Sequence, residues 1–302
     1  MKNNKTILIT GATGLIGGHI IKALTGAGYG YIALTTHPDS ARKKLAGAEK
    51  IVGVNDYLSL KDEKISGIIN LAGANLGEKR WTEKNKKIFY DSRIDITRKL
   101  VHLIEVMPEK PEVLLSASGV DYYGDTGSAD MYEDAPPADT FLGKLTHDWE
   151  AEALKAQVFG VRTAVLRTGF VVAKDSDAVK KLLLPFKLFV GGPLGGGKQY
   201  ISWIHIDDLV SAYLFLIENN LSGAFNASSP DPETNKEFGR SAARVLHRPA
   251  IFSVPAFMLK LILGEMSAVV LDGRRALPGR LLEAGFRFKF THSTEAWKDI
   301  LE

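Results

Sequence analysis

The residues best suited to proton transfer lie in the stretch TFLGK, residues 140–144. A tyrosine four positions before Lys144 would form an acid–base pair, because the lysine charge lowers the tyrosine pKa from about 10 toward neutrality. The chain has Thr140 there instead, and a threonine hydroxyl is far less acidic and sits on a shorter side chain. Three interpretations are open: altered chemistry, an inactive site, or a chance similarity.

Other hydroxyl groups lie just before this stretch, in SASGVDYYGD. Tyr122 and Tyr123 follow the carboxyl end of a predicted strand, the edge at which ligands bind in open α/β sheets. Either tyrosine, or a water molecule, could supply the proton that Thr140 cannot. Stacking as packed aromatic side chains is an equally good interpretation of both residues.

A second candidate site is the glycine turn TGATGLIGG at residues 10–18. Gly11, Gly14 and Gly17 lie between an apolar strand and a helical pattern. Glycine allows the backbone to approach a pyrophosphate closely, and the helix N-terminus offers free N–H groups and a positive dipole end. Because strand and helix flank the glycines as this mechanism requires, we predict a dinucleotide site rather than an empty turn.

The choice between NAD and NADP depends on the end of the second strand, LTTHPDSARKK. An acid there would bind the ribose 2′-hydroxyl, whereas cations favour a 2′-phosphate. Thr36 lies in the turn, and three basic residues follow at 42–44. The missing acid and the basic cluster favour NADP(H). A solvated helix face explains the cluster equally well, so NAD(H) is not excluded.

The loop GPLGGGKQ at 192–199 is similar to a nucleoside-triphosphate loop but fails as one. Gln199 stands where a magnesium-binding serine or threonine is needed, and the next residues alternate as a strand rather than a helix. We expect a substrate-cleft loop with Lys198 facing an anionic group and Trp203 shaping the cleft; a flexible surface loop is the alternative. No metal site is expected, because His205 in HIDD lacks metal-ligand spacing.

A sheet must position these candidates, and the first half of the chain alternates short apolar runs with helical patterns. Helices are expected at 15–24 and at 82–107, the second with Thr82 as N-cap. Apolar strands separated by helices indicate an α/β fold with a doubly wound parallel sheet. The expected strands are 6–10, 31–36, 50–54, 67–73, 112–118 and 161–171.

We expect residues 1–171 to form the nucleotide-binding domain, continued by a strand and helix at about 200–219. Residues 172–199 and 220–302 are expected to form a smaller, discontinuous substrate lobe, because prolines interrupt their helical patterns. The apolar stretch 252–271 contains Lys260 and Glu265, which favours a buried or groove-lining helix over a membrane span.

Composition limits the function classes. The 302 residues are 45% hydrophobic, carry a net charge of +3 and include no cysteine. Disulfides and thiol catalysis are excluded, and the small charge gives no argument for nucleic acid. We expect a cytoplasmic protein with a small-molecule substrate, no nucleic-acid partner and no membrane partner. The helix beginning after Thr82 could form a homodimer face or only cover the sheet.

Several motifs occur in an order that resembles the extended short-chain dehydrogenase/reductase superfamily. They are TGATGLIG, NLAG (70–73), YYGD (122–125) and WIHIDDLVSA (203–212). Longer stretches, including KRWTEKNK (79–86), HDWEAEA (147–153) and ALPGRLLEAGFRF (276–288), are similar to an atypical group, the epimerase-family oxidoreductases. The resemblance covers nearly the whole chain. It implies a Rossmann-type NADP-binding domain with a small substrate lobe.

The resemblance implies roles for individual residues. Lys144 would hold the nicotinamide ribose, Ser118 (or Ser116) would orient an oxygen of the substrate, and Tyr123 would contact the substrate or transfer its proton. Related sequences often have an arginine in place of Thr36. The remaining cofactor residues would be Gly11, Thr13, Gly14, Leu15, Ile16, Leu71, Ala72 and Gly73, and the cleft candidates Arg93, Tyr122, Lys198 and Trp203.

The sequence therefore predicts an NADP-dependent oxidoreductase or epimerase-like enzyme with a degenerate Tyr-x-x-x-Lys site at Thr140 and Lys144. Its substrate would be small or sugar-like and would react at a carbon–oxygen centre. The alternative is a catalytically silent NADP-binding sensor or scaffold, which the missing tyrosine makes credible.

Overall fold

Seven parallel strands form the central sheet of the computed structural model, which describes residues 5–302. Their order is β11-β7-β5-β4-β1-β2-β3, so the direction of winding reverses between β4 and β1. The expected α/β fold with a doubly wound parallel sheet is confirmed. The strands are β1 (Thr6–Thr10), β2 (Gly30–Thr35), β3 (Lys50–Gly53), β4 (Gly67–Asn70), β5 (Val113–Gly119), β7 (Arg162–Thr168) and β11 (Gly223–Ala227).

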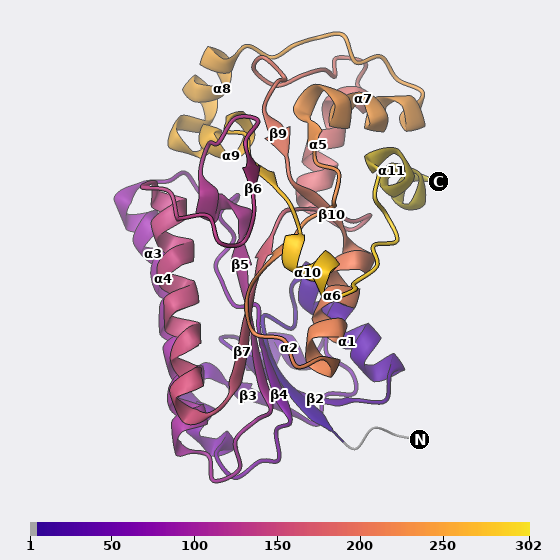
Figure 1. Ribbon diagram of the computed structural model, residues 1–302. Coiled ribbons are helices and arrows are strands. Elements are labelled where there is room, and N and C mark those ends of the chain that lie inside the picture. The colour runs from indigo at the N-terminus through magenta and orange to yellow at the C-terminus, as the bar shows by residue number, and fades with distance from the viewer. Residues whose placement is uncertain (1–4) are drawn as a thin grey trace.

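Helices cover both faces of the sheet (Figure 1). On one face lie α1 (Leu15–Gly26) and α6 (Ile206–Glu218), and on the other α3 (Glu83–Val106) and α4 (Phe141–Leu154). Side chains alternate across a strand, so Ile7 and Ile9 of β1 pack in one core cluster and Leu8 in the other. As expected, Thr82 caps α3: its hydroxyl accepts the Asn85 N–H at 3.3 Å.

Two segments depart from the expected arrangement. The seventh strand, β11, lies in the segment 220–302 that was assigned to the small lobe. The expected strand 200–206 is instead two short strands, β9 (Tyr200–Ile201) and β10 (Trp203–His205), outside the central sheet. They pair with β12 (Glu233–Thr234) and β8 (Phe170–Val172). The division into two domains otherwise stays a prediction.

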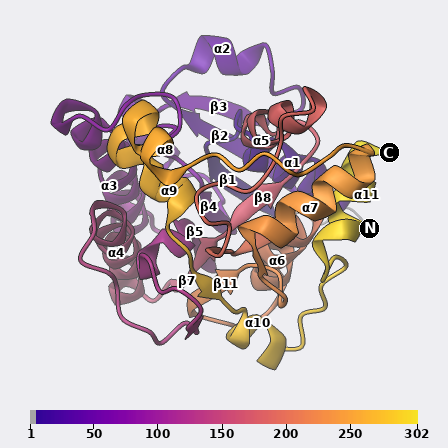
Figure 2. The same ribbon diagram turned by 90° about the horizontal axis from the view of Figure 1, so that it is seen from above.

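The smaller lobe lies beyond the carboxyl ends of the strands (Figures 1 and 2). Trp203, Phe238 and Trp297 are fully buried in its core. A parallel pair, β6 (Asp130–Met131) and β13 (Arg275–Ala276), ties it to the loop after β5. Its helices are α5 (Asp177–Lys187), α7 (Asn235–Leu246), α8 (Ala256–Leu263), α9 (Ala268–Leu271) and α11 (Ser293–Leu301), whereas α10 (Gly279–Glu283) packs against β11.

The apolar stretch 252–271 was expected to be a buried or groove-lining helix; the buried alternative is wrong for its longest helix, and the groove-lining alternative stays a prediction. Helix α8 contains no buried residue, because the stretch breaks into α8, the 3-10 turn η4 (Gly264–Ser267) and α9. Within residues 5–302, no helix has the length and apolar character that crossing a bilayer requires. The remaining elements are α2 (Pro38–Arg42) and the 3-10 turns η1 (Val54–Leu60), η2 (Val120–Tyr123) and η3 (Lys155–Phe159).

Candidate functional site

The turn between β1 and α1 has the geometry of an anion-binding turn. A Cβ at Gly11, where φ is +67°, would lie 2.7 Å from the carbonyl oxygen of Leu71, and a Cβ at Gly17 would lie 2.3 Å from that of Gly11. Both positions therefore require glycine. Gly14 is the N-cap of α1 and no side chain caps this helix. Its first-turn amides are available for an anion.

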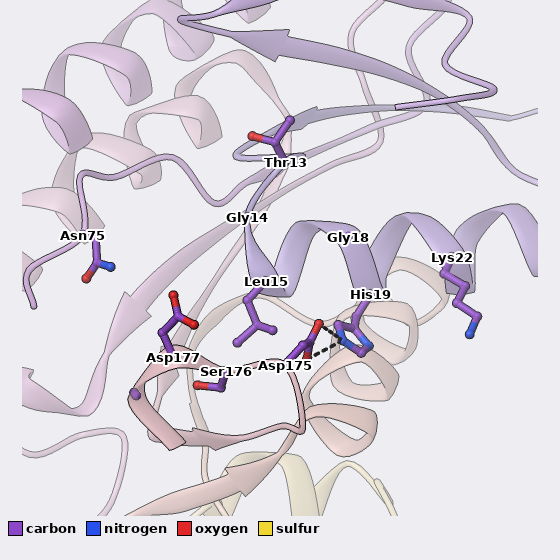
Figure 3. Close-up of a pocket in the computed structure, with 11 residues that line it drawn as sticks. Thr13, Gly14, Leu15, Gly18, His19, Lys22, Asn75, Asp175, Ser176 and Asp177 are labelled. Atoms are coloured by element: carbon purple, nitrogen blue, oxygen red, sulfur yellow. Dashed lines mark hydrogen bonds and ion pairs between the residues drawn. The ribbon is translucent and has the colours of Figure 1, made fainter. Parts of the chain in front are cut away.

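A cavity of about 680 Å³ opens beside this turn. Figure 3 shows the start of α1 on one side and the loop leading into α5 on the other, with Asn75 at the end. His19 Nε2 lies 3.2 Å from Asp175 Oδ2, so this contact joins the two walls. Ile16 is not among the lining residues, which are Thr13, Gly14, Leu15, Gly18, His19, Lys22, Asn75 and residues 175–178.

The end of β2 has no acidic residue at the position that would bind a ribose 2′-hydroxyl. Thr36 follows the strand and is exposed. The next carboxylate, Asp39, accepts a hydrogen bond of 2.5 Å from Arg42. Lys43 and Lys44 are exposed. The missing acid and the exposed basic residues, the two features that favoured a 2′-phosphate, are therefore both present after β2.

A buried polar network fixes the end of β4 against β1. The Thr10 hydroxyl donates to Asn70 Oδ1 at 2.7 Å and accepts the amide hydrogens of Leu71 and Ala72, both at 3.1 Å. Leu71 in turn contacts the glycine turn through its carbonyl group. The expected cofactor residues at the end of β4 are thus held rigidly next to that turn.

Ser116 belongs to the same network. Its side chain is fully buried, and its hydroxyl accepts a hydrogen bond of 3.2 Å from Asn70 Nδ2. Asn70 also donates to Thr97 Oγ1 at 2.8 Å, and Trp149 Nε1 donates to the same oxygen at 3.0 Å. Ser116 therefore joins β5 to β4 and α3 rather than facing a cleft.

Arg93 of α3 packs directly beneath the end of β4. A Cβ added to Gly73 would lie 2.8 Å from the Arg93 guanidinium carbon, so glycine is needed for this contact. The guanidinium donates to the carbonyl oxygens of Ala74 at 3.2 Å and Phe89 at 3.0 Å and lies over the Trp149 ring. It forms no ion pair with a described residue, and burial lowers its pKa to about 10.

Ser118 and Tyr123 are bound by a buried ion pair. The Ser118 hydroxyl donates to Glu150 Oε1 at 2.6 Å, and Arg167 donates to both Glu150 oxygens at 2.9 Å. The Tyr123 hydroxyl donates to Asn226 Oδ1 at 2.7 Å and accepts from Arg167 at 2.8 Å. The three elements β5, β7 and β11 therefore converge on these two hydroxyl groups.

This arrangement restricts proton transfer by Tyr123. Its side chain is only 4% exposed, and burial raises the pKa of the hydroxyl to about 12 although Arg167 lowers it. Tyr122 is also buried, with its ring 3.5 Å from the Arg167 guanidinium carbon and edge-to-face with Tyr123. Both tyrosines are therefore buried, packed aromatic side chains, as the second interpretation of the sequence predicts.

Thr140 has a structural role that tyrosine could not fill. It is the N-cap of α4, and its hydroxyl accepts the Gly143 N–H at 3.1 Å. Lys144, one turn later, is exposed and forms an ion pair of 2.7 Å with Asp139, whose hydrogen bond raises the lysine pKa. No hydrogen bond connects Lys144 to Ser118 among the described residues.

The last two cleft candidates, Lys198 in the glycine loop 192–199 and Trp203 after it, lie in different environments. Lys198 is exposed, as a cleft-loop cation would be. Gln199 fastens the loop by donating to the carbonyl oxygens of Leu194 at 3.0 Å and Val270 at 2.9 Å. The expectation for Trp203 is wrong: its side chain is 0% exposed and packs beside Phe238 in the lobe core.

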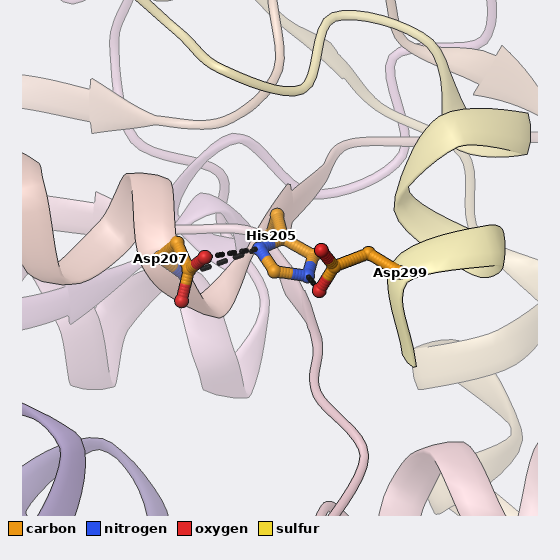
Figure 4. A group of neighbouring side chains, drawn as sticks. All are labelled: His205, Asp207 and Asp299. Atoms are coloured by element: carbon orange, nitrogen blue, oxygen red, sulfur yellow. Dashed lines mark hydrogen bonds and ion pairs between the residues drawn. The ribbon is translucent and has the colours of Figure 1, made fainter. Parts of the chain in front are cut away.

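The cluster of His205, Asp207 and Asp299 is a capping device. His205 Nδ1 accepts the Asp207 amide hydrogen at 3.2 Å, so His205 itself is the N-cap of α6. Its Nε2 lies 3.4 Å from Asp299 Oδ2. Figure 4 shows the two carboxylates on opposite sides of the ring, and one possible ligand atom from each of the three residues lies within 4.8 Å of the others.

Sequence reasoning missed Glu150, Arg167 and Asn226. One signal was available: Arg167 interrupts the apolar strand VRTAVLRT, and a buried arginine requires a partner. Glu150 in HDWEAEA offered no comparable signal, because acidic residues on a helix are usually solvated.

Comparisons with known proteins agree with this geometry. The profile of the NAD dependent epimerase/dehydratase family matches residues 7–228, and that of a domain of unknown function, DUF1731, matches residues 254–300. Curated epimerase family proteins of Staphylococcus haemolyticus and Staphylococcus epidermidis are 39% and 37% identical over 305 residues, and each alignment covers 99% of both chains.

Solved structures give the same result. Human epimerase family protein SDR39U1 (isoform 2), solved with NADPH, superimposes with a TM-score of 0.89 at 29% identity and 98% coverage of both chains. A UDP-galactose 4-epimerase has a TM-score of 0.75 at 19% identity, with 98% of this chain and 97% of that one covered, which shows the fold alone. The resemblance inferred from the motifs is confirmed, and the chain belongs to the NAD dependent epimerase/dehydratase family.

Proposed function

We propose that the chain is an NADP(H)-dependent oxidoreductase or epimerase-like enzyme that acts at a carbon–oxygen centre of a small or sugar-like substrate. The observation that carries this proposal is the first turn of α1, which has no side-chain cap and opens into the cavity beside it. The NADPH in the structure of the human relative supports the choice of cofactor.

The residues present fit a dinucleotide. A pyrophosphate would lie against the first amides of α1, at a turn whose close backbone packing requires glycine at positions 11 and 17. Thr36 and the exposed Lys43 and Lys44 would face a 2′-phosphate. When bound, the nicotinamide supplies or accepts a hydride.

Two residues would act at the reacting end. Lys144 would hold the ribose after leaving Asp139, a change favoured by the solvent exposure of that pair. Ser118 lies at the carboxyl end of β5, where its hydroxyl would orient a substrate oxygen if it turned away from Glu150. Because Tyr123 already uses its hydroxyl in two hydrogen bonds, a water molecule is the proton carrier we propose.

Titration of the purified chain with NADPH and NADH tests cofactor binding. We expect NADPH to bind at least roughly tenfold more tightly, a difference of about 1.4 kcal/mol. Gly14→Ala should weaken binding, because a Cβ there would lie 3.3 Å from the carbonyl oxygen of Gly11 and so disturb the turn, although φ of −81° suits alanine. Gly26→Ala is the control, since a Cβ there has open space. A preference for NADH contradicts the cofactor choice, and binding of neither contradicts the proposal.

Turnover separates the enzyme from the silent sensor or scaffold. The protein is incubated with NADPH and a panel of ketones, aldehydes and nucleotide sugars while nicotinamide absorbance is followed. Loss of absorbance indicates reduction, and product without net cofactor loss indicates epimerisation. The sensor is favoured by the capping role of Thr140 and the fully bonded Tyr123. Tight NADPH binding without turnover of any substrate would establish it.

A further inference from the structure

Positive charge is concentrated on two segments of the small lobe, 177–198 and 235–260. Together they hold nine of the chain's 38 lysine and arginine residues but only two of its 35 acidic residues. The rest of the chain holds 29 basic and 33 acidic residues. The net charge of +3 thus combines two strongly cationic segments with a slightly anionic remainder of the chain.

All nine basic side chains of the two segments are exposed, and we call them together the cationic face: Lys180, Lys181, Lys187, Lys198, Lys236, Arg240, Arg244, Arg248 and Lys260. The two acids do little to neutralise them. Asp177 forms a surface pair with Lys180 at 3.1 Å, and Glu237 accepts the Thr234 hydroxyl hydrogen in the capping box of α7. The cationic face is therefore open to an anionic partner.

Large apolar side chains are exposed among these cations. Leu188, Phe189 and Val190, which follow α5, are 62%, 54% and 52% exposed, and Ile251 and Phe252 are 73% and 53% exposed. We call these five residues the apolar tip. The two parts lie side by side, because the amide of residue 252 donates to the carbonyl oxygen of residue 191 at 3.1 Å.

Cationic and apolar groups meet directly in this region. The Arg248 guanidinium carbon lies 4.5 Å from the centre of the Phe189 ring. Helix α8 adds Phe257 and Leu261, which are 70% and 80% exposed. Figures 1 and 2 place α5, α7 and α8 at the same end of the molecule, with the segment between α7 and α8 crossing its upper surface.

We propose that the cationic face and the apolar tip dock the protein onto an anionic lipid bilayer. Lysine and arginine side chains near the bilayer surface attract acidic headgroups. Exposed leucine and phenylalanine enter the boundary between headgroups and acyl chains. The proposal departs from the expectation of no membrane partner, which rested on the lack of a predicted membrane-spanning segment.

Other occupants match the surface less well. A second copy bound through this face would bring Lys187 and Arg248 against cations of the same kind, since a two-fold contact pairs one patch with itself. A nucleic acid would satisfy the cations and leave the apolar tip in water. An anionic bilayer engages both kinds of group at once.

Co-sedimentation with vesicles of equimolar phosphatidylglycerol and phosphatidylcholine tests the proposal, with phosphatidylcholine vesicles alone as the uncharged reference. We expect the wild-type protein to sediment only with the anionic vesicles, and to be released at ~1 M salt, where the Debye length is about 3 Å. No association with anionic vesicles at low salt would overturn the proposal.

Two double variants separate the contribution of the cationic side chains to vesicle binding from that of the apolar tip. Lys187→Glu with Arg248→Glu should weaken vesicle binding roughly tenfold or more. Leu188→Ser with Phe252→Ser should also weaken it, because apolar insertion is lost. The matched control is Lys61→Glu with Lys64→Glu, two exposed lysines that precede β4 at the opposite edge of the sheet. All variants should keep their NADPH affinity and circular dichroism, since every changed side chain is exposed.

The alternatives give different outcomes. Vesicle binding that is unchanged by Leu188→Ser with Phe252→Ser would show charge attraction alone and overturn docking through the apolar tip. Retention on heparin together with no vesicle binding would assign the face to a polyanion. A dimer in analytical ultracentrifugation that the same variant dissociates, without vesicle binding, would assign it to a second copy.

Discussion

The Arg167 guanidinium donates two parallel hydrogen bonds of 2.9 Å to the Glu150 carboxylate at the base of the candidate site. Both side chains are buried, with exposed fractions of 4% and 7%. The carboxylate also accepts from Ser118, and the guanidinium also donates to Tyr123. One ion pair therefore fixes the positions of two residues that the sequence suggested for catalysis.

We predict that Glu150→Gln destabilises the protein by about 3–5 kcal/mol, because it leaves a buried arginine charge without its partner. Urea unfolding measures the loss. Glu150→Leu combined with Arg167→Met should be much less damaging, since both charges are removed together. Asp91→Asn, which breaks an exposed pair with Lys87, is the control and should hardly move the midpoint. Equal effects of the first two variants would contradict the ion-pair argument.

Tyr123→Phe should reduce the loss of stability in alkaline solution. The pKa of Tyr123 is about 12 in the folded protein, above its usual value of about 10, so the unfolded chain releases the proton first. Stability should be constant below pH 10 and fall between pH 10 and 12. Tyr122 and Tyr213 also have raised pKa values, so the variant removes part of the slope. Unfolding measured across this range with an unchanged slope would contradict the prediction.

The central sheet was predictable because its strands are apolar runs of the right length between helical patterns. Strand β11 was not, because GAFNA has neither β-branched residues nor alternation. Its place depends on tertiary contacts: Asn226, the fourth of the five residues of the strand, donates to the carbonyl oxygens of Met131 and Leu277. A strand that is stabilised by residues so distant in the sequence has no local sequence pattern that would predict it.

The glycine turn could also be predicted, because turn, strand and helix are adjacent in the chain. The hydrogen-bond partners of the candidate hydroxyl groups could not be predicted. Ser118 donates to Glu150, 32 residues away, and Tyr123 donates to Asn226, 103 residues away. The motif identifies which hydroxyl groups lie near the edge of the sheet, but the fold decides which of them are free.

Thr140→Tyr, which would complete the Tyr-x-x-x-Lys pattern, should destabilise the protein. The hydroxyl of Thr140 caps α4, and tyrosine cannot make that local hydrogen bond, so stability should fall by about 0.5–2 kcal/mol. Thr140→Ala should lose a similar amount of stability, and Thr140→Ser should keep most of the stability that the cap contributes. Thermal unfolding compares the three. If Thr140→Tyr were as stable as the wild type, the capping role assigned here would be wrong.

His205→Asn should make the protein more resistant to acid. Burial lowers the pKa of His205 although Asp207 and Asp299 raise it, while Lys289 and His19 lower it further. The unfolded chain therefore binds a proton below about pH 6.5 that the folded chain resists, so stability is lost as pH falls below that value.

Asparagine keeps the cap of α6 and does not titrate. Urea midpoints measured from pH 7.5 down to 5 should fall less steeply in this variant, and His292→Asn, on an exposed side chain, serves as the control. Equal slopes in wild type and His205→Asn would assign the acid sensitivity to other groups.

Arg93→Met distinguishes an anion-binding role from a packing role. Among residues 5–302 the guanidinium donates hydrogen bonds only to carbonyl oxygens, and burial lowers its pKa to about 10 although Asp121 raises it. Replacing such a charge by an apolar side chain of similar length should change stability little or increase it.

If the charge serves the cofactor or the substrate anion, NADPH affinity or KM should worsen roughly tenfold, equivalent to about 1.4 kcal/mol. Arg93→Lys should recover part of that loss, because a cation is restored without the guanidinium's geometry. Lower stability with unchanged affinity and KM would instead show that Arg93 only supports Gly73 and Trp149.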